Sequence, residues 1–319
     1  MKLLKKQGMN LCLAVIVAVL AAMPLLLQSG VLTASSTILY LGKCIAFAIV
    51  AMGLDLIWGY TGILSLGHGL YFALGGYAMA MYLKLQATGG SITDFMHVGG
   101  LTELPMIWKP FQTLLGAIIM LFVVPTVVSG LIGYFIFKKR GNIFLLFYGA
   151  LLLMVLTYVL CRFLTTRKFG KLLVAIRDGE NRTCFSGYQV SHYKTFVYVL
   201  SAIMAAVAGA VFVNFNGSIT PSQMTISYSI TMVIWVAVGG RGTIIGAVIG
   251  AFLINLCEYN LSSGGLVDVW QYIIGAVFVL TILFMKGGLV GLFCEQIPAL
   301  WHKERKPKVD LTQKTQKGA

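Results

Sequence analysis

Charged residues are scarce in this sequence: they make up 11% of its 319 residues, whereas hydrophobic residues make up 58%. A soluble domain usually carries about 25% charged residues. Long polar connections are also few, and apolar windows of roughly 18 or more residues recur, which is long enough to cross a bilayer core. The short alternating segments of a transmembrane β-barrel are missing. The sequence therefore predicts an all-α, polytopic membrane protein.

Motifs for catalysis and for cofactor binding are also missing. The sequence has no Ser/His/Asp triad motif, no zinc-ligand spacing and no phosphate-binding loop after a strand. The six cysteines show no metal-ligand or redox spacing, so we interpret them as small apolar packing residues. We therefore expect no metal, no cofactor and no enzyme activity. Any energy source must come from a partner or an ion gradient.

The net charge is +14, yet nucleic acid is not the expected partner. The basic residues lie between the apolar runs and at both ends of the chain, which fits the excess of Lys and Arg in cytoplasmic loops of membrane proteins. Lys2, Lys5 and Lys6 place the N-terminus in the cytoplasm. The apolar run that follows, 11–27, could belong to a cleavable signal peptide, but its length favours a retained first span.

Several apolar segments are candidate membrane spans, and we expect about eight or nine crossings. They cover 11–29, 36–57, 63–84, 111–137, 143–161, 195–213, 226–238 with 243–258, and 267–285. Residues 1–301 form one expected membrane domain, with a charged cytoplasmic connection at about 165–194. The tail 302–319 is polar and basic, and we expect it to be disordered and cytoplasmic.

One junction conflicts with a simple topology. The basic sequences KKR at 138–140 and RFLTTRKFGK at 162–171 both favour the cytoplasm, but only one clear span, 143–161, lies between them. One crossing cannot join two cytoplasmic loops. Either one apolar segment is not a simple crossing, or a span is missing after residue 140.

The sequence WGYTGILSLGHG at 58–69 places four glycines and one histidine between two apolar runs. Glycine lets helix backbones approach closely in a bilayer, and it permits a helix to break where protein or water receives the freed backbone groups. Interrupted helices often form transport sites. The candidates for the pathway or for helix packing are Gly62, Ser65, Gly67, His68 and Gly69. The alternative is that the glycines only pack and that His68 is a buried, hydrogen-bonded side chain.

A second glycine-rich sequence, VIWVAVGGRGTIIGAVIGAFLINL at 233–256, also separates two apolar runs. Gly242, Gly246 and Gly250 recur every four residues, as on a small-residue face of a helix. Arg241 suits the cytoplasmic edge of the membrane, where its guanidinium can reach water or a partner. Gly240, Arg241, Gly242, Gly246 and Gly250 are therefore candidates of the same kind. The two glycine-rich segments form at most a weak internal repeat.

The connection FGKLLVAIRDGENRTCFSGYQVSHYK at 169–194 mixes apolar and charged residues. The apolar ones include Leu172, Leu173, Val174 and Ile176, and the charged ones include Arg177, Asp178, Glu180 and Arg182. This pattern predicts a short amphipathic helix at the membrane surface over 172–188. Gly187 would end it, because glycine is the usual residue just past a helix C-terminus. The alternative is an ordinary solvated loop.

Three of these sequences resemble one family of membrane proteins. GLDLIWGYTGILSLGHGLYFALGGYAMAMYL, VAIRDGENRTCFSGYQVSHYK and ITMVIWVAVGGRGTIIGAVIGAFLIN are similar to permease subunits of ATP-binding-cassette importers for branched-chain amino acids and amides. The similarity is closest to the second permease subunit of urea importers, and it covers most of residues 10–295. TPSQM at 220–224 resembles a further motif of such proteins.

The resemblance implies a subunit of the bacterial plasma (inner) membrane with both termini in the cytoplasm. The implied partners are a homologous permease subunit, two ATPase subunits and an extracytoplasmic solute-binding protein. ATP hydrolysis in the partners would then drive alternating access for urea or short amides. The segment 172–188 would dock onto an ATPase, and the matching coupling residues are Arg177, Asp178, Glu180, Asn181, Arg182 and Gly187.

The sequence departs from this family after residue 140. Relatives carry another apolar span there, whereas this chain runs from FKKRGN directly into IFLLFYGALLLMVLTYVLCRFL. The topological conflict falls at the same junction, so both observations indicate a missing span. Three alternatives stay open: a permease for branched-chain amino acids, an ion-coupled carrier or channel, and a non-transporting remnant. The low charge of the spans favours a neutral solute over an amino acid, which needs partners for both of its charges.

Overall fold

The computed structural model describes residues 12–24, 35–87, 143–263, 275–276, 279 and 288–291. All regular structure in these residues is helical, which confirms the all-α class. The helices are Cys12–Pro24, α2 (Ser35–Thr61), α3 (His68–Ala87), α7 (Ile143–Thr166), α8 (Lys168–Asp178), α9 (Glu180–Phe185), α10 (Val190–Asn216), the 3-10 helix η2 (Pro221–Met224), α11 (Ile226–Gly239), α12 (Ile244–Ser263) and α14 (Gly288–Gly291).

Three helices in the described part of the chain are long and apolar enough to cross a membrane, namely α2, α7 and α10. The pair α11 and α12 passes the same test jointly and is bent by 117° at the break between them. The expected spans at 36–57, 143–161 and 195–213 therefore coincide with helices. Outside the described residues lie the expected span 111–137, the KKR sequence at 138–140, most of the expected span 267–285 and the tail 302–319. The missing span after residue 140 stays a prediction.

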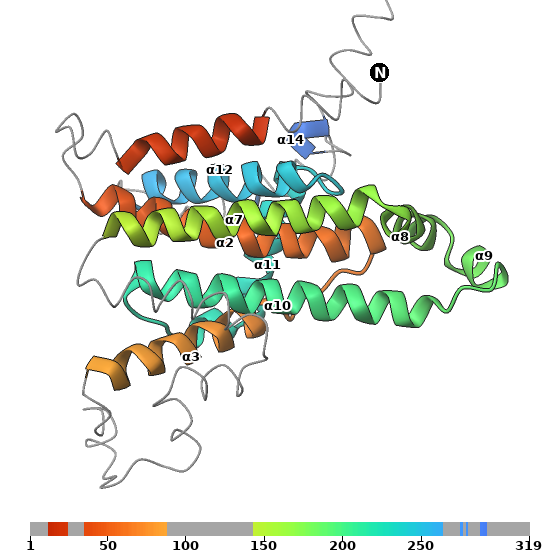
Figure 1. The fold of residues 1–319 in the computed structure, drawn as a ribbon, viewed down its shortest axis with the longest axis horizontal. Coiled ribbons are helices and arrows are strands. Elements are labelled where there is room, and N and C mark those ends of the chain that lie inside the picture. The colour runs from red at the N-terminus through yellow and green to blue at the C-terminus, as the bar shows by residue number, and fades with distance from the viewer. Residues whose placement is uncertain are drawn as a thin grey trace, which may run out of the picture.

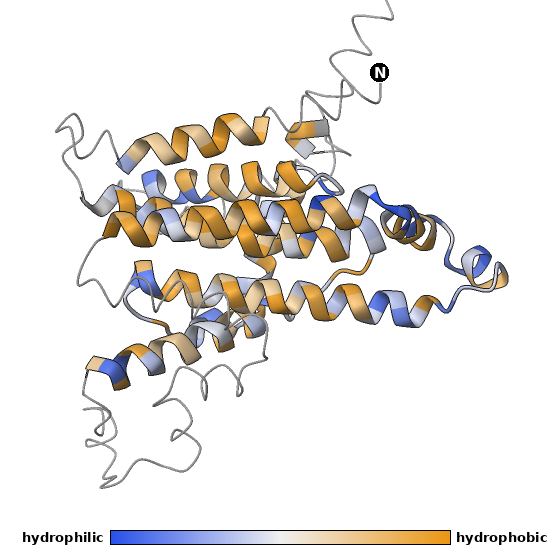
Figure 2. Cartoon of the chain, in the orientation of Figure 1, coloured by the Kyte–Doolittle hydropathy of each residue, from blue (hydrophilic) through white to orange (hydrophobic). Residues whose placement is uncertain are grey.

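Helix α2 lies inside the bundle and packs against α7, α10, α11 and α12 (Figure 1). α2 and α10 run in opposite directions, because Gly42 early in α2 faces Phe215 near the end of α10, and Gly53 faces Met204. Hydrophobic residues cover the helices along the length of the bundle (Figure 2). Hydrophilic residues gather at the end where α8 and α9 project, which is where α2 ends and α10 begins.

Aromatic rings fill the contact between α2, α3, α10 and α11. The ring centroid of Phe47 lies 4.7 Å from that of Trp235 and 5.3 Å from that of Phe212. Phe72 of α3 joins them at 5.3 Å from Phe212, and all four residues are buried. Pairs at such distances contribute about 0.5–1.5 kcal/mol beyond their buried area. This cluster holds α3 and α11 against α2 and α10.

Helix α3 begins at His68, so the expected helix over 63–84 was placed five residues too early. Residues 62–67 are not helical. Gly62 has a φ of +82°, a left-handed conformation that disfavours every residue with a β-carbon, and α2 therefore ends at Thr61. The chain then turns back along α10 before α3 starts (Figure 1). The glycine-rich sequence thus separates α2 from α3, which would otherwise form one continuous apolar helix.

The expected single helix over 172–188 is wrong, because the structure has two helices that meet at Gly179. Glycine costs about 1 kcal/mol relative to alanine inside a helix, which favours a break at this position. The Thr183 hydroxyl donates hydrogen bonds to the carbonyls of Ala175 (3.2 Å) and Gly179 (3.0 Å), and so closes the corner between α8 and α9. Gly187 has a φ of +85° and ends the turn after α9, as expected of a residue near a helix C-terminus.

Candidate functional site

The first turns of α3 and α11 meet inside the bundle. The backbone N–H of Gly69 donates to Ser229 Oγ at 3.0 Å. A β-carbon at Gly69 would lie 2.6 Å from Ser229 Oγ and 3.1 Å from the carbonyl oxygen of Gln223, so only glycine fits without movement of the neighbours. A non-helical segment precedes each of them: 62–67 leads into α3, and 217–220 leads through η2 into α11. Two interrupted segments therefore contact each other at this junction.

His68 is fully buried and pins the interruption to two other helices. Its Nε2 lies 2.6 Å from Ser201 Oγ on α10, and its Nδ1 lies 2.9 Å from Ser65 Oγ. Ser201 donates its one hydroxyl hydrogen to the carbonyl of Gly53 on α2 at 2.6 Å. It must therefore accept from His68 Nε2, which leaves Nδ1 of the neutral ring to accept from Ser65. His68 is thus a buried side chain with a hydrogen-bond partner at each ring nitrogen, and it holds the start of α3 against α10.

Two tyrosines flank the histidine on its less buried side. The hydroxyls of Tyr71 and Tyr198 lie 3.0 Å apart, and both rings stand edge-on to the imidazole at about 6 Å. A β-carbon at Gly67 would lie 4.0 Å from the Tyr198 hydroxyl, so the space beside Gly67 is open enough for a methyl group. Gly67 belongs to the interruption but not to a close helix contact. The sequence candidates in this segment were glycines, Ser65 and His68. Tyr71 and Tyr198 were not among them, and only the fold brings them to this position.

The glycine face of α12 packs directly on α11. A β-carbon at Gly250 would overlap the carbonyl of Trp235, and one at Gly246 would lie 2.9 Å from the carbonyl oxygen of Gly239. The turn between the helices contains Gly240 and Gly242, with φ of 133° and 80°. The four-residue glycine spacing therefore serves helix packing, and the turn itself needs backbone conformations that favour glycine.

The C-terminal end of α2, from Asp55 onward, makes contacts with two arginines of other elements. Arg177 of α8 donates from Nη1 to the carbonyl of Gly59 at 2.7 Å. Arg241 donates from Nε to the carbonyl of Trp58 at 3.1 Å and stacks on its ring at 4.8 Å. Asp55 is fully buried, and its Oδ1 accepts from the backbone N–H of Gly242 at 2.6 Å. A lone carboxylate inside the apolar run 44–57 was a detectable signal, because an ionisable residue in a span is expensive and usually functional.

The α8–α9 segment turns part of its expected apolar face inward, while Leu172 and Val174 remain partly exposed. Leu173 is fully buried and Ile176 is 2% exposed, so neither offers contact area to another protein. Phe185, at the end of α9, is 91% exposed and is the apolar side chain that the segment presents outward. The sequence interpretation overlooked Phe185 because it lies outside the cluster 172–176 on which the expected apolar face was based.

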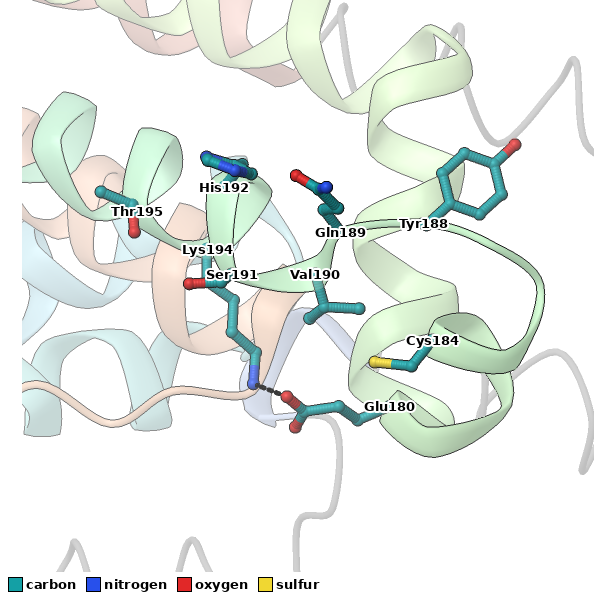
Figure 3. A pocket seen from close by; sticks show the side chains of 9 residues that line it. All are labelled: Glu180, Cys184, Tyr188, Gln189, Val190, Ser191, His192, Lys194 and Thr195. Atoms are coloured by element: carbon teal, nitrogen blue, oxygen red, sulfur yellow. Dashed lines mark hydrogen bonds and ion pairs between the residues drawn. The ribbon is translucent and has the colours of Figure 1, made fainter.

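The polar and charged residues around Gly179 remain largely at the surface. Asn181 and Arg182 are exposed, and Asp178 pairs with Arg177 at 3.0 Å. Glu180 forms an ion pair with Lys194 of α10 at 2.6 Å, across an open pocket of about 610 Å³ (Figure 3). The pocket is lined by Glu180, Cys184, Tyr188, Gln189, Val190, Ser191, His192, Lys194 and Thr195.

Comparison with known proteins identifies related sequences. A family described as "Branched-chain amino acid transport system / permease component" matches residues 36–150 and 134–282, which together cover more than half of the chain. The galactose/methyl galactoside import permease protein MglC of Escherichia coli (strain K12) is 25% identical over 320 residues, which cover 88% of this chain and 93% of that protein.

Other relatives match over shorter regions. The fructose import permease protein FrcC of Rhizobium meliloti is 27% identical over 141 residues, 42% of this chain and 39% of that protein. The xylose transport system permease protein XylH of Escherichia coli (strain K12) is 30% identical over 127 residues, 38% of this chain and 32% of that protein. The chain thus spans about two fifths or less of these two relatives. No solved structure is significantly similar to it.

Proposed function

Because the chain belongs to the family of permease components of branched-chain amino acid transport systems, we propose that it forms, with a homologous permease subunit, the membrane pathway of an ATP-driven importer. It is a multi-pass membrane transport subunit and not an enzyme. The proposed partners are two ATPase subunits on the cytoplasmic side and an extracytoplasmic solute-binding protein. The proposed location is the bacterial inner membrane, with both termini and the α8–α9 segment in the cytoplasm, because positive charge concentrates in that segment and at both termini.

The observation that carries this proposal is the projecting α8–α9 segment with its exposed phenylalanine. The segment extends past the end of the bundle (Figure 1), and much of it is hydrophilic (Figure 2). Phe185 is 91% exposed and shares the short helix α9 with the charged residues Glu180 and Arg182, so burial of its ring against a partner would be favourable. Aromatic anchors surrounded by charged residues are typical of protein interfaces. We assign Phe185 as the anchor for the ATPase subunit, with Glu180, Asn181 and Arg182 around it.

A docking element must also be rigid if it is to transmit movement. Leu173 and Ile176 seat α8 in the bundle, and the Thr183 hydroxyl ties α9 to the end of α8. The ion pair between Glu180 and Lys194 ties α9 to the start of α10. Movement imposed on Phe185 would therefore reach α8 and α10 together.

The proposed pathway passes the junction where α3 and α11 begin. Interrupted helices whose first turns meet inside a membrane protein commonly form transport sites, because irregular backbone in a bilayer must be received by protein or by a water-filled cavity. The backbone N–H of Gly69 is hydrogen-bonded to Ser229 at this junction. The hydroxyls of Tyr71 and Tyr198 lie beside it. ATP-driven movement of these segments would expose the pathway to the two sides in turn.

The proposed solute is urea or a short amide, because the quoted sequence motifs resemble those of urea permeases and because the hydroxyls near the junction are neutral. A branched-chain amino acid would need a carboxylate acceptor and an ammonium partner, and the side chains placed here are those of tyrosine, serine and neutral histidine. The relatives are named for galactose, fructose and xylose, which are also neutral solutes. Uptake of labelled urea must therefore be compared with uptake of these sugars and of leucine.

The proposal is tested by capture of the ATPase subunits on the tagged permease. Phe185→Ala removes the exposed ring, and loss of an interface anchor costs about 2 kcal/mol or more, which is roughly a 30-fold loss of affinity. Leu152→Ala is the control, because Leu152 on α7 is a large apolar side chain that is 65% exposed and lies outside the projecting segment. We expect ATPase capture and uptake to fall for Phe185→Ala only. Equal capture by wild type and Phe185→Ala would contradict the docking role.

A further inference from the structure

Side chains from two other elements bind the C-terminal end of helix α2. The last four carbonyls of a helix have no partner within it, and arginine side chains can satisfy them. Arg177 binds the carbonyl of Gly59 from α8, and Arg241 binds the carbonyl of Trp58 from the α11–α12 turn. A single helix end is therefore fastened to the projecting segment and to the glycine turn at the same time.

Asp55 of α2 adds a third contact at this end of the helix. Its Oδ1 accepts from the backbone N–H of Gly242, but its Oδ2 is buried without a hydrogen-bond partner. A β-carbon at Gly59 would lie 2.6 Å from the nitrogen of Gly242, and one at Gly242 would lie 3.7 Å from Arg177 Nη1. The Asp55 carboxylate and the Arg177 guanidinium thus both lie close to the turn at Gly242. A buried carboxylate oxygen without a hydrogen-bond partner is unfavourable. Asp55 Oδ2 can therefore accept a hydrogen bond from a guanidinium that moves toward it.

Arg177 also lies against the start of the interruption before α3. The side chain of Arg177 passes Gly62, whose β-carbon position lies 3.1 Å from Arg177 Cγ. Gly62 is the first residue of the non-helical segment that leads to Ser65 and His68. Displacement of Arg177 would therefore disturb the interruption before α3 as well as the turn between α11 and α12.

We propose that Arg177, Asp55 and Arg241 form a mechanical joint that transmits movement of α8 to the α11–α12 turn and to the interruption before α3. The transport role of this joint rests on the proposed docking of α9 to an ATPase. Arg177 is accordingly a positioning residue that faces into the permease, whereas Phe185, Asn181 and Arg182 face the partner. When α8 is displaced, a guanidinium exchanges its carbonyl contact on α2 for the free oxygen of Asp55.

Hydrogen exchange on the purified permease tests the joint without any ATPase. Arg177→Gln removes the guanidinium, and we expect the amides of residues 240–243 to exchange about tenfold faster or more, because local opening of the turn becomes easier. Lys171→Gln is the control, since it removes a cation from the exposed side of the same helix. If Arg177→Gln folds poorly, Arg177→Lys takes its place, and we expect a smaller increase in the exchange rate of the same amides. Unchanged exchange at 240–243 in both Arg177 variants would overturn the joint.

Uptake by the assembled importer supplies the second arm. Arg177→Gln should keep its ATPase subunits while the amount of solute moved per ATP hydrolysed falls several-fold. Asp55→Asn retains an oxygen acceptor for Gly242, so it should lose less coupling than Asp55→Leu. Loss of ATPase capture by Arg177→Gln would make Arg177 a docking contact and overturn its inward role. If Phe185→Ala captures ATPases normally, the docking proposal fails, while the exchange experiment still decides whether the joint exists.

Discussion

Gly67 and Gly69, on either side of the start of α3, should respond differently to a single added methyl group. In Gly69→Ala the new carbon would lie 2.6 Å from Ser229 Oγ and 3.1 Å from the carbonyl oxygen of Gln223, at the contact between α3 and α11. In Gly67→Ala the nearest atoms, Ser65 Oγ and the Tyr198 hydroxyl, both lie 4.0 Å away. The two substitutions are chemically identical and only two residues apart, so they separate packing from backbone effects.

The expected magnitudes follow from these distances. Overpacking of a fitted contact costs about 1–3 kcal/mol, and the better helix propensity of alanine at Gly69 returns at most about 1 kcal/mol. We therefore expect Gly69→Ala to destabilise the protein by about 1–2 kcal/mol. Gly67→Ala removes conformational freedom from the unfolded chain and meets no neighbour, so we expect it to be neutral or stabilising by up to about 1 kcal/mol.

Thermal unfolding of the purified protein in detergent, with uptake measured in parallel, checks this difference. Gly69→Ala should lower the unfolding midpoint by a few degrees and reduce uptake, whereas Gly67→Ala should leave both close to wild type. The double variant Gly69→Ala/Ser229→Ala should lose less stability than the sum of the losses in the two single variants, because the two side chains compete for one space. Similar midpoints for both single variants would refute the close contact between α3 and α11.

Two further predictions concern the buried histidine and the orientation of the projecting segment. Ser201→Ala leaves His68 Nε2 and the carbonyl of Gly53 without partners, so we expect a loss of about 1–3 kcal/mol in unfolding free energy. Exposed Ser191 on the same helix is the control, and equal stability of both alanine variants would contradict the network. A variant with the exposed Cys184 as its only cysteine should react with an impermeant thiol reagent in inside-out vesicles but not in intact cells. Labelling in intact cells would place α9 outside.

Local sequence signals located most of the described helices, because a long apolar run in a bilayer has no alternative to an α-helix. The runs at 36–57, 143–161 and 195–213 became α2, α7 and α10 with small extensions at their ends. Glycine content also located the interruption near 62–69 and the turn at 240–243. Glycine permits a break but does not choose its residue, so the start of α3 was misplaced by five residues. The break at Gly179 was missed for the same reason.

The roles of single side chains depended on contacts between distant segments. Arg177 looked like a surface charge for an ATPase, but it reaches Gly59, 118 residues away in the chain. Leu173 and Ile176 formed an apolar face on α8, and the fold covers that face with α2 and α7 rather than leaving it for a partner.

Hydropathy and glycine spacing act over one or two helical turns, and for that reason they determine the class of protein, the helices and the places where helices can break. Which side chain satisfies an unpaired carbonyl, and which face of a helix remains exposed, depends on how all the helices pack together. Asp55, His68 and Phe185 illustrate the difference. Their residue types are plain in the sequence, but burial of the first two and exposure of the third arise only when the bundle assembles.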